Sequence, residues 1–170
     1  MDVFSYAGGF SVHALANEAT EVTSLDISKQ ALDLAVENGK LNEYSGIHKT
    51  MAGDAFKEMK ALINKGKRFD VVVIDPPSFA KQQSEIDLAK KKYAQLAELG
   101  AKLTTKKGLL VLASCSSRVL AQAFYDLNVQ ALNSQSRLYD TLLKTKHDSD
   151  HPVTFTEGAY LKCGYYRFLE

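Results

Sequence analysis

The sequence has 170 residues, of which 45% are hydrophobic and 24% are charged. This length and composition are typical of one globular domain with a single core, and the chain is too short for two. The 21 Lys and Arg residues nearly balance the 20 Asp and Glu residues, and a net charge of +1 excludes strong general attraction to nucleic acid or to an anionic membrane. No apolar run approaches the roughly 20 residues of a membrane span, and no secretory signal is present, so we expect a cytoplasmic protein without a membrane partner.

The chain begins with a very short predicted strand, Met1–Phe4, which runs almost at once into a glycine pair that opens a helix. Glycines at such a turn allow the backbone to approach a ligand closely. The aromatic rings of Phe4 and Tyr6 crowd the place of a pyrophosphate, which favours a nucleoside ligand without phosphates. Because the first strand is so short, we expect the chain to be a piece of a longer protein, cut inside or just before this strand.

The second predicted strand, residues 21–25, ends at Asp26, eighteen residues after Gly8. An acidic side chain at this place can accept hydrogen bonds from the hydroxyls of a ribose. The alternative is a tight turn with an unrelated surface Asp, which is common for either feature alone and less favoured for both together. An amphipathic helix capped by Ser28 follows, over residues 28–41.

A short strand at 47–51 and a helix at 55–64 come next, with Asp54 between them. Asp54 can cap this helix, bind a ligand, or do both. The three junctions that carry the glycine pair, Asp26 and Asp54 all follow parallel strands, so we expect them at one edge of the sheet.

The strand predicted at 69–74 is continuously apolar from Val71 to Ile74, which is typical of a central strand covered on both faces. It ends in the segment Asp75–Phe79, where two prolines make a rigid loop that can present the ring of Phe79 to a planar base. A simple Pro-Pro turn is the alternative, and the carboxylate at the end of a central strand makes it the less favoured one. A helix at 84–103 follows.

The strand predicted at 108–113 leads to Cys115, ahead of a helix over 118–132. The dipole of a helix starting near Ser117 or Arg118 can favour a thiolate, so Cys115 is a candidate nucleophile in preference to a structural thiol. Cys163 lies inside a predicted strand and is expected to be structural. Two cysteines form no disulfide framework, and the four histidines show no metal-ligand spacing with them, so no metal site is predicted.

The last two predicted strands, 137–143 and 160–168, have no helix between them and are expected to pair antiparallel at an edge. The preceding alternation of strands and helices predicts an α/β fold with a doubly wound, largely parallel sheet.

These residues resemble class I S-adenosylmethionine-dependent methyltransferases, and among them the bacterial large-subunit ribosomal RNA cytosine-5 methyltransferases. The resemblance covers nearly the whole chain. The matching segments are Asp2–Phe10 with the first cofactor motif, Leu25–Asp26 with the ribose-binding acid, Gly53–Asp54 with the adenine-binding acid, Asp75–Phe79 with the catalytic loop, Ser114–Ser116 with the catalytic cysteine motif, and His151–Pro152 and Glu157–Lys162 with the closing loop and final strand.

The resemblance implies a Rossmann-like, doubly wound, seven-stranded and mostly parallel sheet whose last strand is antiparallel. It implies S-adenosylmethionine as cofactor and RNA, in particular ribosomal RNA, as partner. The implied catalytic residues are Cys115, Asp75 and Phe79. The implied cofactor-binding residues are Phe4, Ser5, Tyr6, Gly8, Gly9, Asp26, Ile27, Asp54, Ala55, Asp75 and Pro76.

The family also has an N-terminal PUA domain and a connecting domain, so the expected organisation is a single catalytic domain over residues 1–170 that lacks its RNA-binding portion. Many RNA cytosine-5 methyltransferases carry a further cysteine where this chain has Ser78, which favours a mechanism with one cysteine. Glu157 and Asp75 are the candidates for the base that removes the C5 proton. Two alternatives stay open: methylation of an exocyclic nitrogen such as guanine N2, and a noncatalytic module that binds the cofactor or RNA.

Overall fold

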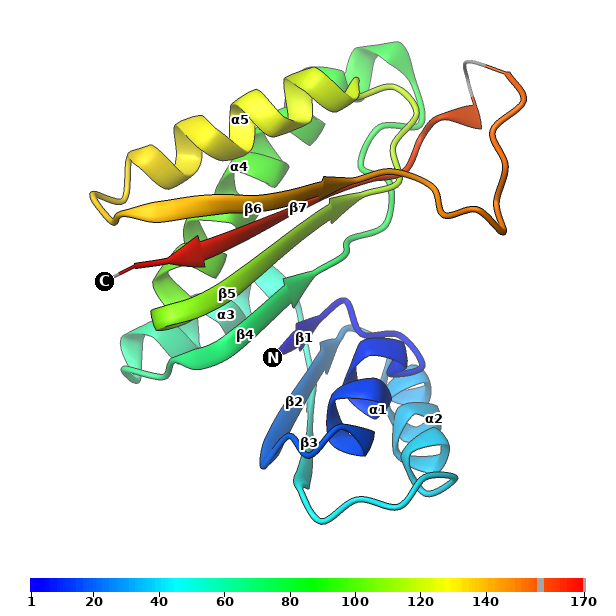
Figure 1. The fold of residues 1–170 in the computed structure, drawn as a ribbon, viewed down its shortest axis with the longest axis vertical. Helices are drawn as coiled ribbons and strands as arrows, with labels where there is room; N and C mark the ends of the chain where they lie inside the picture. Colours follow the sequence, from blue (N-terminus) through cyan, green and yellow to red (C-terminus); the bar gives the residue numbers. More distant parts are fainter. Residues whose placement is uncertain (156–157, 170) are drawn as a thin grey trace. The chain divides into compact units, whose positions relative to one another are not determined.

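The computed structural model of the protein describes residues 1–155 and 158–169. The chain divides into two compact units, one of residues Met1–Lys67 and one from Arg68 onward. Figure 1 labels the helices and strands of both units.

The first unit contains three parallel strands in the order β3-β2-β1. Its elements are β1 (Asp2–Val3), α1 (Gly9–Ala16), β2 (Glu21–Asp26), α2 (Lys29–Gly39), β3 (Ile47–Ala52) and α3 (Ala55–Asn64). Helices α1 and α2 pack against each other and against β2 (Figure 1). Ser28 caps α2 as predicted, because its hydroxyl accepts a hydrogen bond from the Ala31 N–H, and the apolar face of α2 is buried on the strands.

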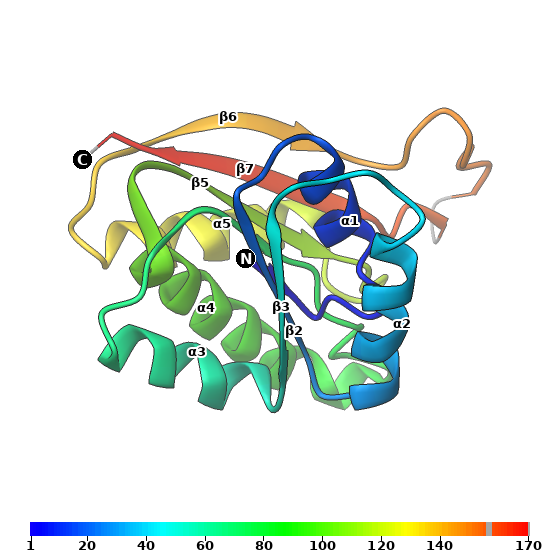
Figure 2. The ribbon, with the colours of Figure 1, turned by 90° about the horizontal axis from the view of Figure 1, so that it is seen from below.

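The second unit contains four strands in the order β4-β5-β7-β6. Its elements are β4 (Phe69–Ile74), a 3₁₀ turn (Gln83–Glu85), α4 (Ile86–Leu103), β5 (Thr104–Ser114), α5 (Ala121–Asn133), β6 (Tyr139–Thr145) and β7 (Lys162–Phe168). Strands β4 and β5 are parallel, and β7 runs antiparallel between β5 and β6. Helices α4 and α5 lie side by side on one face of these strands (Figure 2).

The fold-class prediction is confirmed. The described residues form seven strands, of which the first six are joined by helices. The strands of the first unit are all parallel, and the final strand is antiparallel to its neighbours. Parallel strands joined by helices bring successive strand ends to one edge of a sheet, where the expected ligand site lies. Among the described helices, none combines the length and apolar character needed to cross a membrane.

Two predictions about individual elements are wrong. Strand β4 is not covered on both faces throughout, because Val72 and Ile74 are buried whereas Val71 is 46% exposed. Helix α5 begins at Ala121 rather than near Ser117 or Arg118. The residues before it form a loop in which the side chain of Val119 is buried.

Candidate functional site

The loops that follow β1, β2 and β3 are adjacent in the first unit. The Ser5 N–H donates to the Leu25 carbonyl at 3.1 Å, and the Gly53 N–H donates to the Asp26 carbonyl at 2.9 Å. Val3 pairs with Leu25 and Asp26 with Ala52, so the three strands end at nearly the same level. The glycine loop, Asp26 and Asp54 therefore meet at one edge, as the sequence predicts.

Asp26 is the organising side chain of this edge. Its Oδ2 accepts a hydrogen bond from the Tyr6 N–H and its Oδ1 accepts one from the Ser28 N–H, both at 2.9 Å. A carboxylate has about four acceptor positions, so each oxygen can accept one more hydrogen bond. The half-buried Asp26 carboxylate thus fixes the first loop and can still accept hydrogen bonds from the two hydroxyls of a ribose.

The first loop has an unusual backbone. Phe4 and Tyr6 adopt left-handed conformations with φ of 63° and 45°, which cost side-chain-bearing residues of order 1–3 kcal/mol and cluster at ligand sites. Between them, the Ser5 hydroxyl is buried without a hydrogen-bond partner among the described residues. An orphaned buried hydroxyl and a strained loop beside a carboxylate with spare acceptor positions fit a polar nucleoside cofactor such as S-adenosylmethionine.

The two glycines of this loop have different roles. Gly8 has a φ of 79°, and a Cβ there would lie 2.7 Å from the Cβ of Ala35 on α2, so helix packing requires this glycine. The expectation that both glycines allow a ligand to approach the backbone stays a prediction. A Cβ at Gly9 would meet no atom within 4 Å, so open space adjoins that residue.

Asp54 caps α3, because its Oδ1 accepts the Lys57 N–H at 2.9 Å. Its side chain is exposed, so its second oxygen can take a ligand, in keeping with the dual role considered above. The neighbouring Ala55 is buried, and Ile27, next to Asp26, is exposed and can cover a flat ring.

A buried polar chain that sequence reasoning did not find supports this edge. Asp2 Oδ2 accepts hydrogen bonds from the N–H and hydroxyl of Ser11, whose hydroxyl lies 2.6 Å from that of Ser24. The Ser24 hydroxyl in turn lies 2.8 Å from His48 Nε2. Burial raises the pKa of Asp2, and the Ser11 hydrogen bonds oppose this shift. The chain connects β1, α1, β2 and β3 and so rigidifies the loop that begins after β1.

In the second unit, the predicted catalytic loop follows β4. Asp75 is half-buried at the strand end and Pro76 is buried. The Cys115 thiol lies 3.9 Å from the Pro76 carbonyl oxygen, in reach of a weak S–H hydrogen bond. The structure therefore brings Cys115 to the Asp-Pro-Pro segment, 39 residues away in sequence.

The explanation of Cys115 by a helix dipole is wrong. Helix α5 starts six residues after Cys115, beyond the first turn over which a dipole acts. The loop between them is instead held by the Arg118 Nε, which donates to the Lys81 carbonyl at 3.0 Å.

The ring of Phe79 packs against side chains of α4. Its ring centroid is 5.1 Å from that of Tyr93, and the Lys92 ammonium lies 5.0 Å from the Phe79 centroid. The Tyr93 hydroxyl accepts a hydrogen bond from the buried Ser114 hydroxyl at 2.9 Å. Tyr93 therefore ties the end of β5, just before Cys115, to the Phe79 loop, and sequence reasoning did not find it.

Lys162 is a further residue that the sequence did not indicate as part of the site. It is buried at the start of β7, and its Nζ donates a hydrogen bond to the Ser116 carbonyl. Its sequence signal is its place in an alternating strand, because Lys162 shares the buried parity with Gly164, Tyr166 and Phe168. Burial raises the pKa of the neighbouring Cys163 to about 11, which suits the structural role expected of that thiol.

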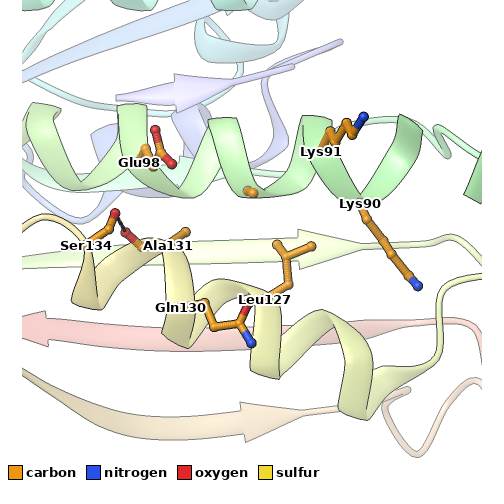
Figure 3. Close-up of a pocket in the computed structure, with 8 residues that line it drawn as sticks. Lys90, Lys91, Glu98, Leu127, Gln130, Ala131 and Ser134 are labelled. Carbon is orange, nitrogen blue, oxygen red and sulfur yellow. Dashed lines mark hydrogen bonds between the residues drawn. The ribbon is translucent and has the colours of Figure 1, made fainter. Parts of the chain in front are cut away.

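Within the described residues no group of His, Cys, Asp and Glu side chains could hold a metal ion, so no metal centre is assigned. The candidate base Glu157 lies outside the described residues. A groove of about 330 Å³ lies between α4 and α5 (Figure 3). It is lined by Lys90, Lys91, Ala94, Glu98, Leu127, Gln130, Ala131 and Ser134, none of which is a predicted site residue.

Known proteins resemble the chain along most of its length. A family model described as S-adenosylmethionine-dependent methyltransferase matches residues 1–136. A ribosomal RNA large subunit methyltransferase from Deinococcus radiodurans is 41% identical over 163 residues, which are 95% of this chain and 40% of the relative. Ribosomal RNA large subunit methyltransferase I from Escherichia coli is 33% identical over 165 residues, which are 95% of this chain and 42% of the relative. The chain thus spans about two fifths of the length of these curated relatives.

Solved structures share the fold. A crystal structure of SMU.776, described as a methyltransferase complexed with SAH, has a TM-score of 0.82 at 22% identity and covers 98% of this chain and 44% of that chain. The structure of NSun6 from Pyrococcus horikoshii with SFG has a TM-score of 0.73 at 15% identity and covers 99% of this chain and 47% of that chain. At these identities the likeness concerns the fold, and it agrees with the doubly wound sheet expected above.

Proposed function

The chain belongs to the family of S-adenosylmethionine-dependent methyltransferases, and we propose that it methylates C5 of a cytosine in large-subunit ribosomal RNA. The curated relatives are named for methylation of this RNA class, which supports RNA as the substrate. The observation that carries cytosine C5 is the thiol of Cys115, 3.9 Å from the Pro76 carbonyl of the Asp-Pro-Pro loop. Carbon methylation needs a nucleophile there, whereas nitrogen methylation does not.

The first unit supplies the residues for the methyl donor in this proposal. Asp26 accepts hydrogen bonds from the ribose hydroxyls, while the strained loop from Phe4 to Gly9 surrounds the rest of the nucleoside. Asp54 and Ala55, together with Ile27, hold the adenine. S-adenosylmethionine, when bound, supplies a methyl group on a positively charged sulfur.

Cys115 performs the first covalent step. Its thiolate donates an electron pair to C6 of cytosine and forms a C–S bond, and the electrons of the C5–C6 double bond move towards C5. After C5 has gained the methyl group, a base removes the C5 proton. The C–H electrons then restore the double bond, the C–S bond breaks, and the thiolate leaves.

Asp75 and Phe79 orient the base in this mechanism. The Asp75 carboxyl group, at the end of β4, hydrogen-bonds the polar edge of cytosine as charge develops on the ring. Phe79, which contacts Tyr93 and Lys92, stacks on a base taken out of its helix. Asp75 is also the described candidate for the base that takes the C5 proton.

The test compares two cysteine variants on unmodified large-subunit ribosomal RNA. Cys115→Ala abolishes methyl transfer and keeps binding of the methyl donor, because the thiol acts on the reaction path and not on the cofactor. Cys163→Ala, the matched control on β7, keeps both. Wild-type turnover in Cys115→Ala would refute carbon methylation and favour transfer to an exocyclic nitrogen such as guanine N2, which the Asp75–Phe79 segment could also serve.

In this proposal, residues 1–170 form the catalytic domain, and the main RNA-binding portion of the complete enzyme is expected outside them. The near-neutral charge of the chain supports this division, because phosphate binding requires an excess of cations. The two cysteines, both free thiols in the structure, are in keeping with action in the cytoplasm.

A further inference from the structure

Lys162 is a buried cation whose position the proposed mechanism does not explain. It is the first residue of β7 and is 1% exposed. Its Nζ donates a hydrogen bond to the Ser116 carbonyl, and another, at 3.0 Å, to the Tyr160 carbonyl. Lysine is almost never fully buried without a compensating partner, since removing an ammonium from water is costly.

Within residues 1–155 and 158–169, no carboxylate forms an ion pair with the Lys162 ammonium. Burial lowers the pKa of Lys162 to about 8, and the charge of Cys115 acts in the opposite direction. Among the described residues, Cys115 is the group whose negative charge favours the Lys162 ammonium.

The antiparallel pairing of β5 with β7 places the start of β7 beside the segment that contains Cys115. Lys162 is paired with Ser114 in the antiparallel register of β7 and β5, directly before the cysteine. The Ser116 carbonyl that binds Lys162 comes directly after it. Cys115 therefore follows Ser114, whose backbone pairs with Lys162, and precedes Ser116, whose carbonyl accepts a hydrogen bond from the Lys162 ammonium.

We propose that Lys162 is a positioning residue that fixes the Cys115 segment and holds a positive charge beside the Cys115 thiolate. The inference rests on the proposed function for its use in catalysis, and on the geometry alone for its effect on the thiol. A nearby cation favours a thiolate in the way that a helix N-terminus does. Because α5 begins too late to act on Cys115, Lys162 takes the place of the helix dipole.

Other titratable groups face the same region and are unchanged in the test. Tyr93 from α4 interacts with the charges of both Cys115 and Asp75, and burial raises the pKa of this phenol. Asp75, from the end of β4, also interacts with Cys163 on β7. A change confined to Lys162 leaves these groups in place, so it isolates the contribution of the ammonium.

The first experiment measures alkylation of Cys115 by iodoacetamide against pH, in a Cys163→Ala background where Cys115 is the single thiol. Lys162→Met keeps the length and apolar stem of the side chain and removes its charge. We expect the midpoint of the pH profile to rise and alkylation at neutral pH to slow several-fold. The matched control is Lys146→Met, at an exposed lysine, which leaves the profile unchanged. An unchanged midpoint in a folded Lys162→Met protein would overturn the proposal.

A reciprocal measurement decides the question if Lys162→Met does not fold. Coupled charges affect each other equally, so Cys115→Ala must lower the titration midpoint of Lys162. The ¹³Cε chemical shift of labelled lysine follows this titration in wild type and in Cys115→Ala. A Lys162 midpoint that stays the same without the thiol contradicts the inference.

These readouts separate the inference from the proposed function. If Cys115→Ala retains methyl transfer, the cytosine C5 proposal fails, while the shift in thiol reactivity still reports on Lys162. If the cytosine C5 proposal and the Lys162 inference both hold, kcat of Lys162→Met is lower than that of wild type at neutral pH and rises partly back at higher pH. The KM for the methyl donor stays unchanged. A purely structural lysine would lower stability without moving either pH midpoint.

Discussion

Asp26 combines a structural and a proposed binding role in one carboxylate. Two of its acceptor positions hold the N–H groups of Tyr6 and Ser28, and we propose that the remaining ones accept hydrogen bonds from a ribose. We expect Asp26→Ala to weaken S-adenosylmethionine binding by about 1.5 to 3 kcal/mol, or tenfold and more, as measured by isothermal titration calorimetry.

The control for this variant is Asp33→Ala. Asp33 is an exposed carboxylate on α2 in the same unit and is paired with Lys29, so its loss changes local charge by the same amount. Equal affinities for Asp26→Ala and wild type would remove Asp26 from the cofactor site. A wild-type preference for NAD over the methyl donor would have the same consequence.

Several elements together hold the first loop through the polar chain from Asp2 to His48. Burial lowers the pKa of His48 below 6.5, although the Asp2 charge opposes this shift. The unfolded chain therefore binds the proton more readily, and the free energy of unfolding falls as the pH decreases from 6.5 through the folded-state pKa of His48.

We expect this fall to be smaller in His48→Gln than in wild type, because glutamine can bond Ser24 without titrating. Chemical denaturation between pH 7 and pH 5 measures the difference. The exposed His13 of α1 provides the control variant, His13→Gln, which follows wild type. Parallel stability curves for His48→Gln and wild type would show that His48 is not the titrating group.

The sequence predicted the elements well wherever local pattern determines them. Helix α3 has the predicted bounds because Asp54 caps it and its apolar residues repeat at helical spacing. The ligand edge of the first unit was predictable for a similar reason, since parallel strands place their ends together and Asp26 and Asp54 stand directly at those ends.

The prediction failed where distant residues determine the structure. The sequence predicted a helix start near Ser117 or Arg118, but the Ser116 carbonyl is bound by Lys162, 46 residues away, and α5 starts only at Ala121. The contacts of Tyr93 with Ser114 and Phe79 are equally non-local. A single sequence gives no local signal for such pairs, and only the parity of Lys162 in β7 hinted at its burial.

At the scale of the whole chain, charge limits how RNA can be held. With a net charge of +1, few cations can displace counterions from phosphates, so the salt dependence of RNA binding should be shallow. We expect a slope of log K against log salt no steeper than about −3, measured by fluorescence anisotropy with a large-subunit ribosomal RNA fragment.

Lys90 and Lys91 on α4 test whether a local basic cluster changes this expectation. We interpret them as a solvated helix surface, so the double variant Lys90→Gln, Lys91→Gln should bind RNA with the wild-type slope. A steep slope in wild type that flattens in the double variant would instead assign the α4 and α5 surface to RNA binding.

The central claim is that Cys115 forms a covalent bond to C6 of cytosine in RNA. Ribosomal RNA containing 5-fluorocytosine tests it most directly, because fluorine at C5 cannot leave as a proton does and the adduct persists after methyl transfer. With the methyl donor present, we expect a protein–RNA complex stable to denaturation in wild type and in Cys163→Ala, and none in Cys115→Ala. A methylating wild-type protein that traps no RNA, or a Cys115→Ala protein that traps it, would contradict the account.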